Sequence, residues 1–324
     1  MKNKIKLIVP GGLNTDIVGI GVPKIVGKGE LAMGGVCKIG PGGKSRNIAS
    51  MASLLLGENE VAMIGKTSKD EFGLWKKPVE SLEKNGVNTD FIKILDFEET
   101  GKMPGIALIP VDKDGNNQIY SIPGINEDFC EKDIDDAEEI FEIAGNNGGA
   151  VAYSLEMPFK TVLHSMDKAK KFGLKNIFDP GGMEENFDYS ELFEREIFLI
   201  KPNEHEAKMF TEIEIKDFES AEKSAKIFFE KGVKNVLITA GINGAYFFSE
   251  KTKKHFKIPE VEDSEFHDET GCGDQTMATL CAFLSKGYNI EKAIEIAILS
   301  GTLQFHKAGI GEIKISDIEK YFEV

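Results

Sequence analysis

The stretch IFLIKPNEHE, residues 197–206, joins an apolar run to a turn and a polar helix start. Its first four residues, 197–200, predict a short buried strand because they are all apolar. Asn203 is a favoured N-cap, and Glu206, three residues later, completes the pattern of a capping box. The stretch therefore predicts a strand that passes through one tight turn into a helix over 204–210.

The same alternation of strand and helix continues on both sides of this stretch. Further strands are predicted over 4–9, 61–64, 151–155, 176–178 and 236–240, and helices over 45–56, 72–85, 159–172 and 219–231. Long helices are expected after Gly273 and Ile290. Regular alternation over this length indicates an α/β fold with a doubly wound, mostly parallel sheet.

Residues 103–122 follow a different pattern. Two runs of strand formers, 105–111 and 118–122, flank a turn around Gly115 and predict a β-hairpin. A hairpin inside an α/β chain suggests a small sheet outside the main one. We expect a single domain over 1–324, with a small β-sheet lid built from about 14–40 and 103–122.

The composition describes an ordinary globular protein. Of 324 residues, 41% are hydrophobic and 29% are charged, which suffices for a large core. The net charge of −15 argues against nucleic acid and anionic membranes as partners. No apolar run approaches the roughly 20 residues of a membrane helix. The four cysteines form no C-x-x-C pair, so we expect free thiols and a cytoplasmic location.

The residues best suited to bind an anion and move a proton lie in DETGCGD, residues 268–274, which leads into an apolar helix. Gly271 and Gly273 let backbone N–H groups point outward, and the helix start adds donors and a positive dipole end. These features suit an anion such as phosphate. Asp274 could take a proton from a hydroxyl that attacks the phosphate. The plain alternative is a turn whose Asp caps the helix.

Cys272 lies between the two glycines, and two interpretations are open. A helix N-terminus can make a thiol acidic, whereas a structural cysteine only fills a position for a small residue.

Polar residues near the N-terminus are candidates for a ligand site. Asn14 and Asp16 follow the first strand and could hold hydroxyl groups, or simply form an Asx turn. In GGKSRN, residues 42–47, two adjacent glycines suggest close approach to a ligand. The spacing is not that of a Walker A motif. Arg46 could point to solvent or meet a phosphate.

Two further motifs are ambiguous by themselves. Asn203 and Glu206 could hold hydrated Mg²⁺ or phosphates instead of only capping a helix. TAGING, residues 239–244, ends a strand and turns back, either as a plain hairpin turn or beside a nucleotide.

Taken in order, these motifs resemble the PfkB (ribokinase-like) carbohydrate kinase family over nearly the whole chain. The family signature Asp-Thr-Thr-Gly-Ala-Gly-Asp is similar to residues 268–274, and its Gly-Gly-x-x-x-Asn helix start is similar to 42–47. The Pro-Asn-x-x-Glu motif is similar to 202–206, and the Thr-x-Gly-x-x-Gly turn to 239–244. Departures are Glu269 and Cys272, residues 45–46 in place of Gly-Ala, and Ile298 near the expected adenine site.

The resemblance implies an enzyme, a phosphotransferase with an alcohol acceptor, and assigns roles to residues. Asp274 would be the base, and Gly271, Cys272 and Gly273 the anion hole. The resemblance also implies that the sugar is bound by Asn14, Asp16, Gly42, Gly43, Lys44, Asn47 and Glu156, and ATP by Asn203, Thr239, Gly241 and Gly244. Glu206 would hold Mg²⁺ indirectly, and Asp268 and Thr270 would bind a monovalent cation such as K⁺.

Within the family, the pattern is most similar to the ribokinases. This similarity implies that the phosphoryl acceptor is a free sugar, and that ribose is the first sugar to expect. The alternatives are a nucleoside, fructose or another hexose, a sugar phosphate, or a noncatalytic sugar-binding relative. The resemblance also implies ATP and Mg²⁺, with K⁺ as a further candidate, and a homodimer paired through the lid.

Overall fold

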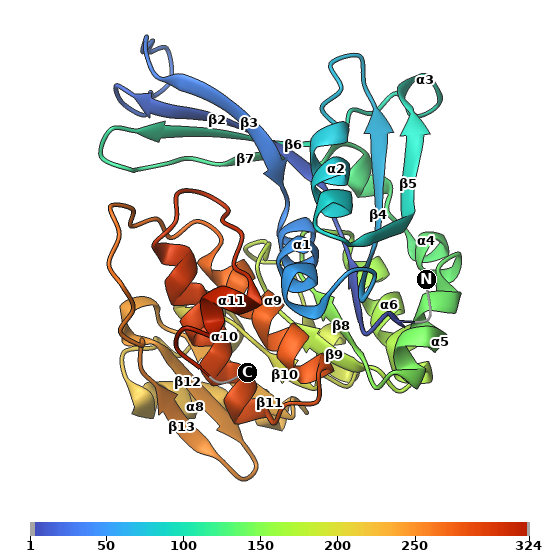
Figure 1. Ribbon diagram of the computed structural model, residues 1–324, viewed down its shortest axis with the longest axis vertical. Coiled ribbons are helices and arrows are strands. Elements are labelled where there is room, and N and C mark those ends of the chain that lie inside the picture. The colour runs from blue at the N-terminus through green and yellow to red at the C-terminus, as the bar shows by residue number, and fades with distance from the viewer. Residues whose placement is uncertain (1–3, 323–324) are drawn as a thin grey trace.

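The computed structural model describes residues 4–322 and arranges them around two β-sheets (Figure 1). Within these residues the larger sheet has nine strands in the order β13-β12-β11-β10-β9-β8-β1-β4-β5. Its strands are β1 (Leu7–Pro10), β4 (Val61–Lys69), β5 (Asn88–Asp96), β8 (Ala150–Tyr153), β9 (Lys175–Phe178), β10 (Leu199–Ile200), β11 (Asn235–Thr239), β12 (Ala245–Ser249) and β13 (Lys253–Phe256). Neighbouring strands from β11 to β5 are parallel, and β12 and β13 add an antiparallel edge. The predicted mostly parallel α/β sheet is confirmed.

Helices cover both faces of this sheet, which makes it doubly wound (Figure 1). One face carries α1 (Lys44–Leu56), α2 (Lys76–Lys84), α9 (Cys272–Ser285), α10 (Ile290–Phe305) and α11 (Ile315–Ile318). The other carries α4 (Glu131–Asp135), α5 (Glu138–Asn146), α6 (Phe159–Lys171), α7 (Glu204–Thr211) and α8 (Phe218–Glu230), while the short α3 (Phe97–Thr100) follows β5.

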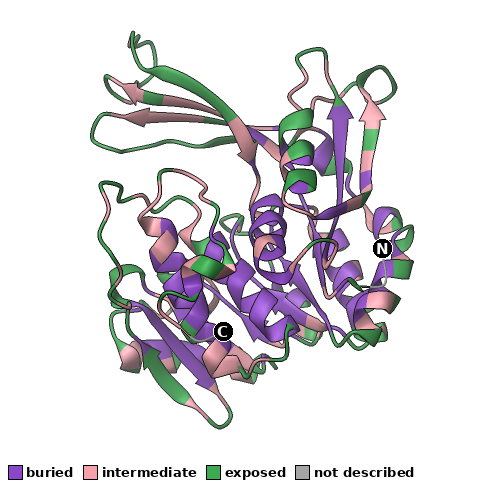
Figure 2. Ribbon diagram, in the orientation of Figure 1, coloured by how far each residue is buried: buried purple, intermediate pink, exposed green. Residues whose placement is uncertain are grey.

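The two faces have separate apolar cores. Leu7 and Val9 of β1 pack into the core under α1, α9 and α10, and Ile8 packs into the core under α5, α6 and α8. Successive side chains of a strand point to opposite faces, so a strand buried on both faces must be apolar throughout. The buried interior of the larger sheet is visible in Figure 2.

The small sheet lies apart from the larger one and has the order β3-β2-β6-β7 (Figure 1). Its strands are β2 (Asn14–Val22), β3 (Val36–Gly42), β6 (Gly105–Asp112) and β7 (Tyr120–Ile122). β6 and β7 form the predicted antiparallel hairpin, in which Oδ1 of Asp112 accepts the N–H groups of Asp114 and Asn116. Segments distant in sequence thus join in one sheet, because β2 pairs in parallel with β6.

Several predicted boundaries are wrong by two or more residues: the strand predicted over 61–64 extends to Lys69, and the strand predicted over 197–200 begins at Leu199. The first strand begins at Leu7 rather than at residue 4. The helix predicted over 72–85 begins at Lys76, because the preceding residues form a turn around Asp70. The Asp70 carboxylate accepts the N–H groups of Phe72 at 2.9 Å and Trp75 at 3.1 Å.

Among residues 4–322, no helix is both long enough and apolar enough to span a membrane.

Candidate active site

The two glycine-containing loops predicted to carry the chemistry meet at Asp274. This residue lies in the first turn of α9, and its side chain is largely buried. Its Oδ2 accepts a hydrogen bond from Nδ2 of Asn47, and its Oδ1 accepts one from Nζ of Lys44, both at 2.8 Å. Asn47 and Lys44 come from α1, which packs against α9. The carboxylate is therefore held from two sides by residues of the 42–47 loop.

Gly271 shapes the start of α9. It is the N-cap residue with φ of +76°, and a Cβ there would lie 2.6 Å from Cδ1 of Ile310. Both the backbone conformation and the space therefore require glycine. A Cβ on Gly273 would point toward Nζ of Lys201, 3.9 Å away. The N-terminal end of this 14-residue helix thus faces a cationic group, and together they suit an anion.

The Cys272 thiol is not acidic. Burial, together with the nearby charges of Asp268, Glu269 and Asp274, raises its pKa to about 12. Of the two interpretations left open by the sequence, the structural cysteine holds, because desolvation and three carboxylates outweigh the helix dipole. Cys272 fills a position for a small residue.

A buried cluster of opposite charges lies beside Asp274. Asp179, directly after β9, is paired through Oδ2 with Nζ of Lys201 at 2.8 Å and through Oδ1 with Nζ of Lys44 at 3.4 Å. Burial would raise the pKa of Asp179, but Lys201 and Lys44 lower it to about 2. Burial would likewise lower the pKa of Lys44, yet Asp179 and Asp274 hold it well above its usual value. Three ionised groups and Asp274 therefore form one network.

Sequence reasoning missed Asp179 and Lys201. Each is the residue that follows a buried parallel strand, β9 or β10. The carboxyl ends of parallel strands are where such sheets present functional groups. That position was the signal that could have identified both residues.

Among the residues predicted to contact a sugar, the structure brings Asp16 and Gly42 together. A Cβ on Gly42 would lie 1.8 Å from Oδ1 of Asp16, so only glycine leaves room for this carboxylate. Oδ1 of Asn14 accepts a hydrogen bond from Nδ2 of Asn126 at 2.9 Å. Because that oxygen is engaged, the NH₂ group of Asn14 is the part that can face a hydroxyl. The sequence offered no signal for Asn126, which lies in the 3₁₀ turn 124–128.

The sequence suggested that Arg46 points to solvent or meets a phosphate, but its side chain is instead engaged by groups of the protein. Its side chain is buried, with 1% of the residue exposed. Nη2 donates to the carbonyl of Pro41 at 2.7 Å and to Oδ1 of Asn47 at 2.5 Å. Burial lowers the pKa of Arg46 to about 10, so it remains a cation at neutral pH.

The charge of Arg46 acts on Asp16. Burial raises the pKa of Asp16 to about 6; the charge of Arg46 opposes this rise, and the charge of Asp274 adds to it.

The loop before α1 also reaches the predicted Glu156. Gly43 is the N-cap of α1 with φ of +92°, and a Cβ there would lie 3.0 Å from the carbonyl oxygen of Gly12. The next residue, Lys44, donates its backbone N–H to Oε2 of Glu156 at 2.8 Å. Lys44 therefore links Glu156 through its backbone to Asp274 through its side chain.

Asn203 and Glu206, predicted to lie near ATP and Mg²⁺, form the expected capping box. Oδ1 of Asn203 accepts the N–H of Glu206, and Oε2 of Glu206 accepts the N–H of Asn203, both at 2.8 Å. Burial and the charge of Asp179 raise the pKa of Glu206, which Lys201 opposes. Glu206 therefore caps α7, and the charges of the buried cluster also act on its pKa.

The turn after β11 packs beside this helix start. Thr239 donates its N–H to the carbonyl of Pro202 at 3.0 Å. Gly241 and Gly244 have φ of +48° and +82°, and a Cβ on Gly244 would lie 2.0 Å from the carbonyl oxygen of Phe256. Gly244 therefore permits the close return of the chain, whereas Gly241 has open space around it.

Comparison with known proteins decides the family. Residues 6–316 match the family model described as pfkB family carbohydrate kinase. The chain belongs to the PfkB carbohydrate kinase family. The kinase is 33% identical over 94% of its length to a bifunctional ribokinase/ribose-5-phosphate isomerase A of Fructilactobacillus sanfranciscensis, of which it spans 53%. It is 31% identical to a ribokinase of Haemophilus influenzae, covering 94% of this chain and 93% of that protein.

Solved structures agree with this assignment. A ribokinase of Arabidopsis thaliana complexed with ribose and ATP superimposes with a TM-score of 0.85 at 25% identity, covering 98% of the kinase and 99% of that chain. A ribokinase of Thermotoga maritima gives a TM-score of 0.82 at 26% identity, covering 98% of each chain.

The two residues predicted to bind a monovalent cation lie together at the end of α10. Oδ1 of Asp268 accepts the N–H of Thr270 at 2.9 Å, and Oδ2 accepts the N–H of Gly309 at 2.8 Å. Burial would raise the pKa of Asp268, but these hydrogen bonds lower it, so the carboxylate is ionised. Gln304, which sequence reasoning missed, donates its side-chain NH₂ to the carbonyl of Thr270 at 3.0 Å.

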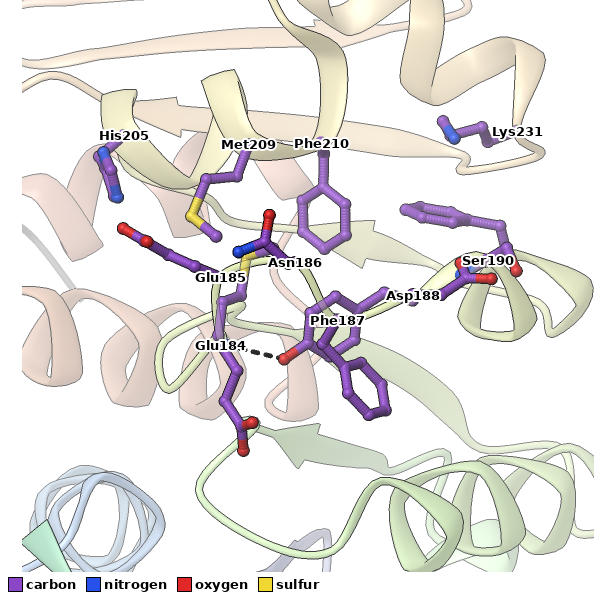
Figure 3. Close-up of a pocket in the computed structure, with 13 residues that line it drawn as sticks. Glu184, Glu185, Asn186, Phe187, Asp188, Ser190, His205, Met209, Phe210 and Lys231 are labelled. Atoms are coloured by element: carbon purple, nitrogen blue, oxygen red, sulfur yellow. Dashed lines mark hydrogen bonds between the residues drawn. The ribbon is translucent and has the colours of Figure 1, made fainter.

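A separate pocket lies beside α7 in the kinase. Its volume is about 520 Å³, and it opens between the 183–190 loop and the side chains of His205, Met209 and Phe210 (Figure 3). The N–H of Glu184 donates to the hydroxyl of Tyr189 across the loop at 2.9 Å. No residue predicted to contact sugar, ATP or metal lines it. The pocket is therefore distinct from the cluster around Asp274.

Proposed function

We propose that the kinase transfers the γ-phosphoryl group of ATP to the primary hydroxyl of a free sugar, with ribose as the preferred acceptor. The observation that carries the proposal is Asp274 at the start of α9, held by Lys44 and Asn47 next to the site of Asn14 and Asp16. Relatives named ribokinase and deoxyribokinase, and a similar structure complexed with ribose and ATP, support it.

The groups around Asp274 suit the transfer step. The Asp274 carboxylate accepts the proton of the sugar hydroxyl while the hydroxyl oxygen bonds to the γ-phosphorus and the bond from that phosphorus to ADP breaks. The helix N-terminus at Gly271 and Gly273 and the ammonium of Lys201 face the negative charge that the phosphoryl group carries. Preorganised donors of this kind contribute about 3 kcal/mol each to transition-state stabilisation.

ATP and Mg²⁺ fit the opposite side of the cluster. Asn203, Thr239, Gly241 and Gly244 would line the nucleotide site. Glu206 would hold Mg²⁺ indirectly, through water, because its carboxylate already accepts the N–H of Asn203. Bound Mg²⁺ supplies positive charge to the phosphates. Potassium is not part of this proposal, because Gln304 engages the carbonyl oxygen of Thr270.

The polar and charged groups near Asp274 restrict which sugars could serve as the phosphoryl acceptor. The half-buried Asp16 accepts from hydroxyl groups, and a site built to do so rejects analogues that lack them. A second candidate is deoxyribose, favoured by a 26% identical relative named deoxyribokinase in Salmonella typhi. A sugar phosphate loses support because Arg46 is buried among protein acceptors.

An acceptor panel tests the proposal. The purified protein is assayed with MgATP and ribose, deoxyribose, fructose, nucleosides or sugar phosphates, and ADP release is measured. We expect the highest kcat/KM with ribose, and a ³¹P spectrum of the product that shows a phosphate on the primary carbon. Absence of turnover with both ribose and deoxyribose would contradict the proposal.

We also propose that the kinase pairs as a homodimer through the lid and acts in the cytoplasm. Apolar side chains are exposed on the small sheet (Val36, Ile39, Tyr120 and Ile122) and at Ile119, directly before β7. Burying some of these side chains against a second copy would remove apolar area from water. The four free cysteines suit a reducing compartment. A mass measurement in solution that finds only monomer would contradict the dimer.

A further inference from the structure

Gln304 is a buried polar residue at the end of α10 with an unusual set of partners. Its residue exposure is 0%. Nε2 donates to the backbone carbonyls of Thr270 at 3.0 Å and Gly309 at 2.5 Å, and Oε1 accepts the N–H of Gly311 at 3.1 Å. A glutamine amide has two N–H donors, and here each meets one carbonyl oxygen.

The two carbonyls belong to loops that meet at Asp268. Thr270 precedes the N-cap of α9, and Gly309 follows the end of α10. Asp268 accepts the N–H groups of the same two residues. Each loop is therefore held twice, by its N–H through Asp268 and by its C=O through Gln304.

This junction is adjacent to the anion hole. A Cβ on Gly271 would lie 3.7 Å from Nε2 of Gln304. The Gln304 amide therefore supports the residue whose left-handed conformation opens the first turn of α9.

A monovalent cation at Asp268 and Thr270 does not fit this arrangement. Backbone carbonyls bind such an ion by converging on it in place of its hydration shell. In this structure the carbonyls of Thr270 and Gly309 converge instead on the NH₂ group of Gln304. The positive ends of its N–H bonds and a cation would compete for the same oxygen atoms.

We infer that the side-chain amide of Gln304 takes the structural place of a monovalent cation, so that this kinase needs no K⁺ to assemble its anion hole. The two N–H donors satisfy the carbonyls that an ion would otherwise ligate. The inference rests on the proposed function only where activity is the readout.

The first experiment uses the unmodified enzyme. Activity and the midpoint of thermal unfolding are measured with KCl, NaCl or the chloride of a bulky organic cation at equal ionic strength, with ATP supplied as the organic-cation salt. We expect kcat to vary by less than about twofold and no unfolding shift specific to K⁺. An enzyme that needs K⁺, or that K⁺ specifically stabilises, would overturn the inference.

The second experiment substitutes Gln304→Ala, which frees the two carbonyls. We expect kcat in the organic cation to fall at least about tenfold, and K⁺ both to restore it and to raise the unfolding midpoint. A variant that is unimpaired, or impaired without response to any cation, contradicts the inference. If the variant does not fold, the response of the unmodified enzyme to K⁺ decides.

Asn176→Ala is the matched control. Its Nδ2 also donates to two backbone carbonyls, those of Glu196 at 2.9 Å and Met166 at 3.4 Å, and its partners lie outside the loops at Asp268. We expect a lower unfolding midpoint without any K⁺ response. If the unmodified protein phosphorylates no acceptor, the proposed function fails, and the cation dependence of unfolding still tests Gln304.

Discussion

Nζ of Lys44 donates a hydrogen bond to Oδ1 of Asp274 at 2.8 Å, across 230 positions of sequence. The same ammonium lies 3.4 Å from Asp179, so the proposed base belongs to a buried charge network. The network holds the Asp274 carboxylate in place at the start of α9, and its members can be tested one at a time.

Asp274→Asn removes the proton acceptor but keeps the shape of the side chain. We expect kcat to fall by about 10²–10⁴-fold, the range for a lost general base, with sugar binding retained. Turnover on ribose and calorimetric binding of ribose are the measurements. A variant with unchanged kcat would remove Asp274 from the role of base.

Gly42→Ala tests the space in front of Asp16. The added Cβ would lie 1.8 Å from Oδ1 of Asp16 and displace the carboxylate. We expect the KM for sugar to rise at least about tenfold while the KM for ATP stays unchanged. Gly40→Ala, on the same strand, is the matched control, because its Cβ would have no neighbour within 4 Å. Equal effects of the two substitutions would argue against the assignment.

Sugar binding should depend on the ionisation of Asp16. Its pKa is about 6, so lowering the pH through 6 protonates the carboxylate and removes acceptor capacity. We expect the KM for sugar to rise about tenfold per pH unit below that point, while it is flat above. A KM that does not change between pH 5 and pH 8 would show that the Asp16 charge is not used.

Arg46→Met should shift this profile toward higher pH. The guanidinium lowers the pKa of Asp16, so its removal raises that pKa further above 6. The fully buried Arg46 is one of two arginines in the chain. Arg195→Met is the control, because Arg195 pairs with Asp167 and Glu194 instead. An unshifted profile in the Arg46 variant would mean that its charge does not act on Asp16.

Asp179→Asn should destabilise the fold. It leaves the ammonium groups of Lys44 and Lys201 without their shared carboxylate, a loss of about 3–5 kcal/mol in the free energy of unfolding. Urea unfolding at pH 7 measures it. Asp135→Asn is the control and should cost less than about 1 kcal/mol, because the Asp135 carboxylate is half exposed and its buried partner Lys168 keeps its pair with Glu138.

The contribution of Asp179 should also depend on pH in one direction. Its pKa in the folded protein is about 2, below its ordinary value of 3.8, so the ionised form stabilises the fold above pH 3.8. That stabilisation is lost as the pH falls from 3.8 through 2. The stability difference between variant and unmodified protein should therefore shrink across this window, and a constant difference would contradict the pairing.

Local patterns predicted much of this molecule. The capping box of Asn203 and Glu206 forms as expected because its two hydrogen bonds lie within four residues of chain. The hairpin around Gly115 forms for the same reason. The parallel sheet followed from the spacing of apolar runs, since strands buried on both faces leave a continuous signal. Asp274, the proposed base, and the glycines at 271 and 273 were singled out from the sequence because they lie within four residues of one another.

Other residues of the site acquire their role only by contact across the fold. Asp179 and Lys201 follow different strands, Asn126 meets Asn14 from 112 positions away, and Gln304 reaches Thr270 from another helix. The sequence left two interpretations of the Cys272 thiol open, because the environment of the thiol is set by burial and by neighbouring carboxylates.

The sequence by itself determined the α/β fold, the helix whose first turn holds Asp274, and the family, because hydrophobic period, caps and glycine turns are encoded in neighbouring residues. Only the tertiary structure decided that Arg46 faces inward, that Lys44 joins Asp179 to Asp274, and that Gln304 spans two loops. Charge and hydrogen-bond partners over such separations depend on how the elements pack against one another, and no local pattern of residues specifies those pairings.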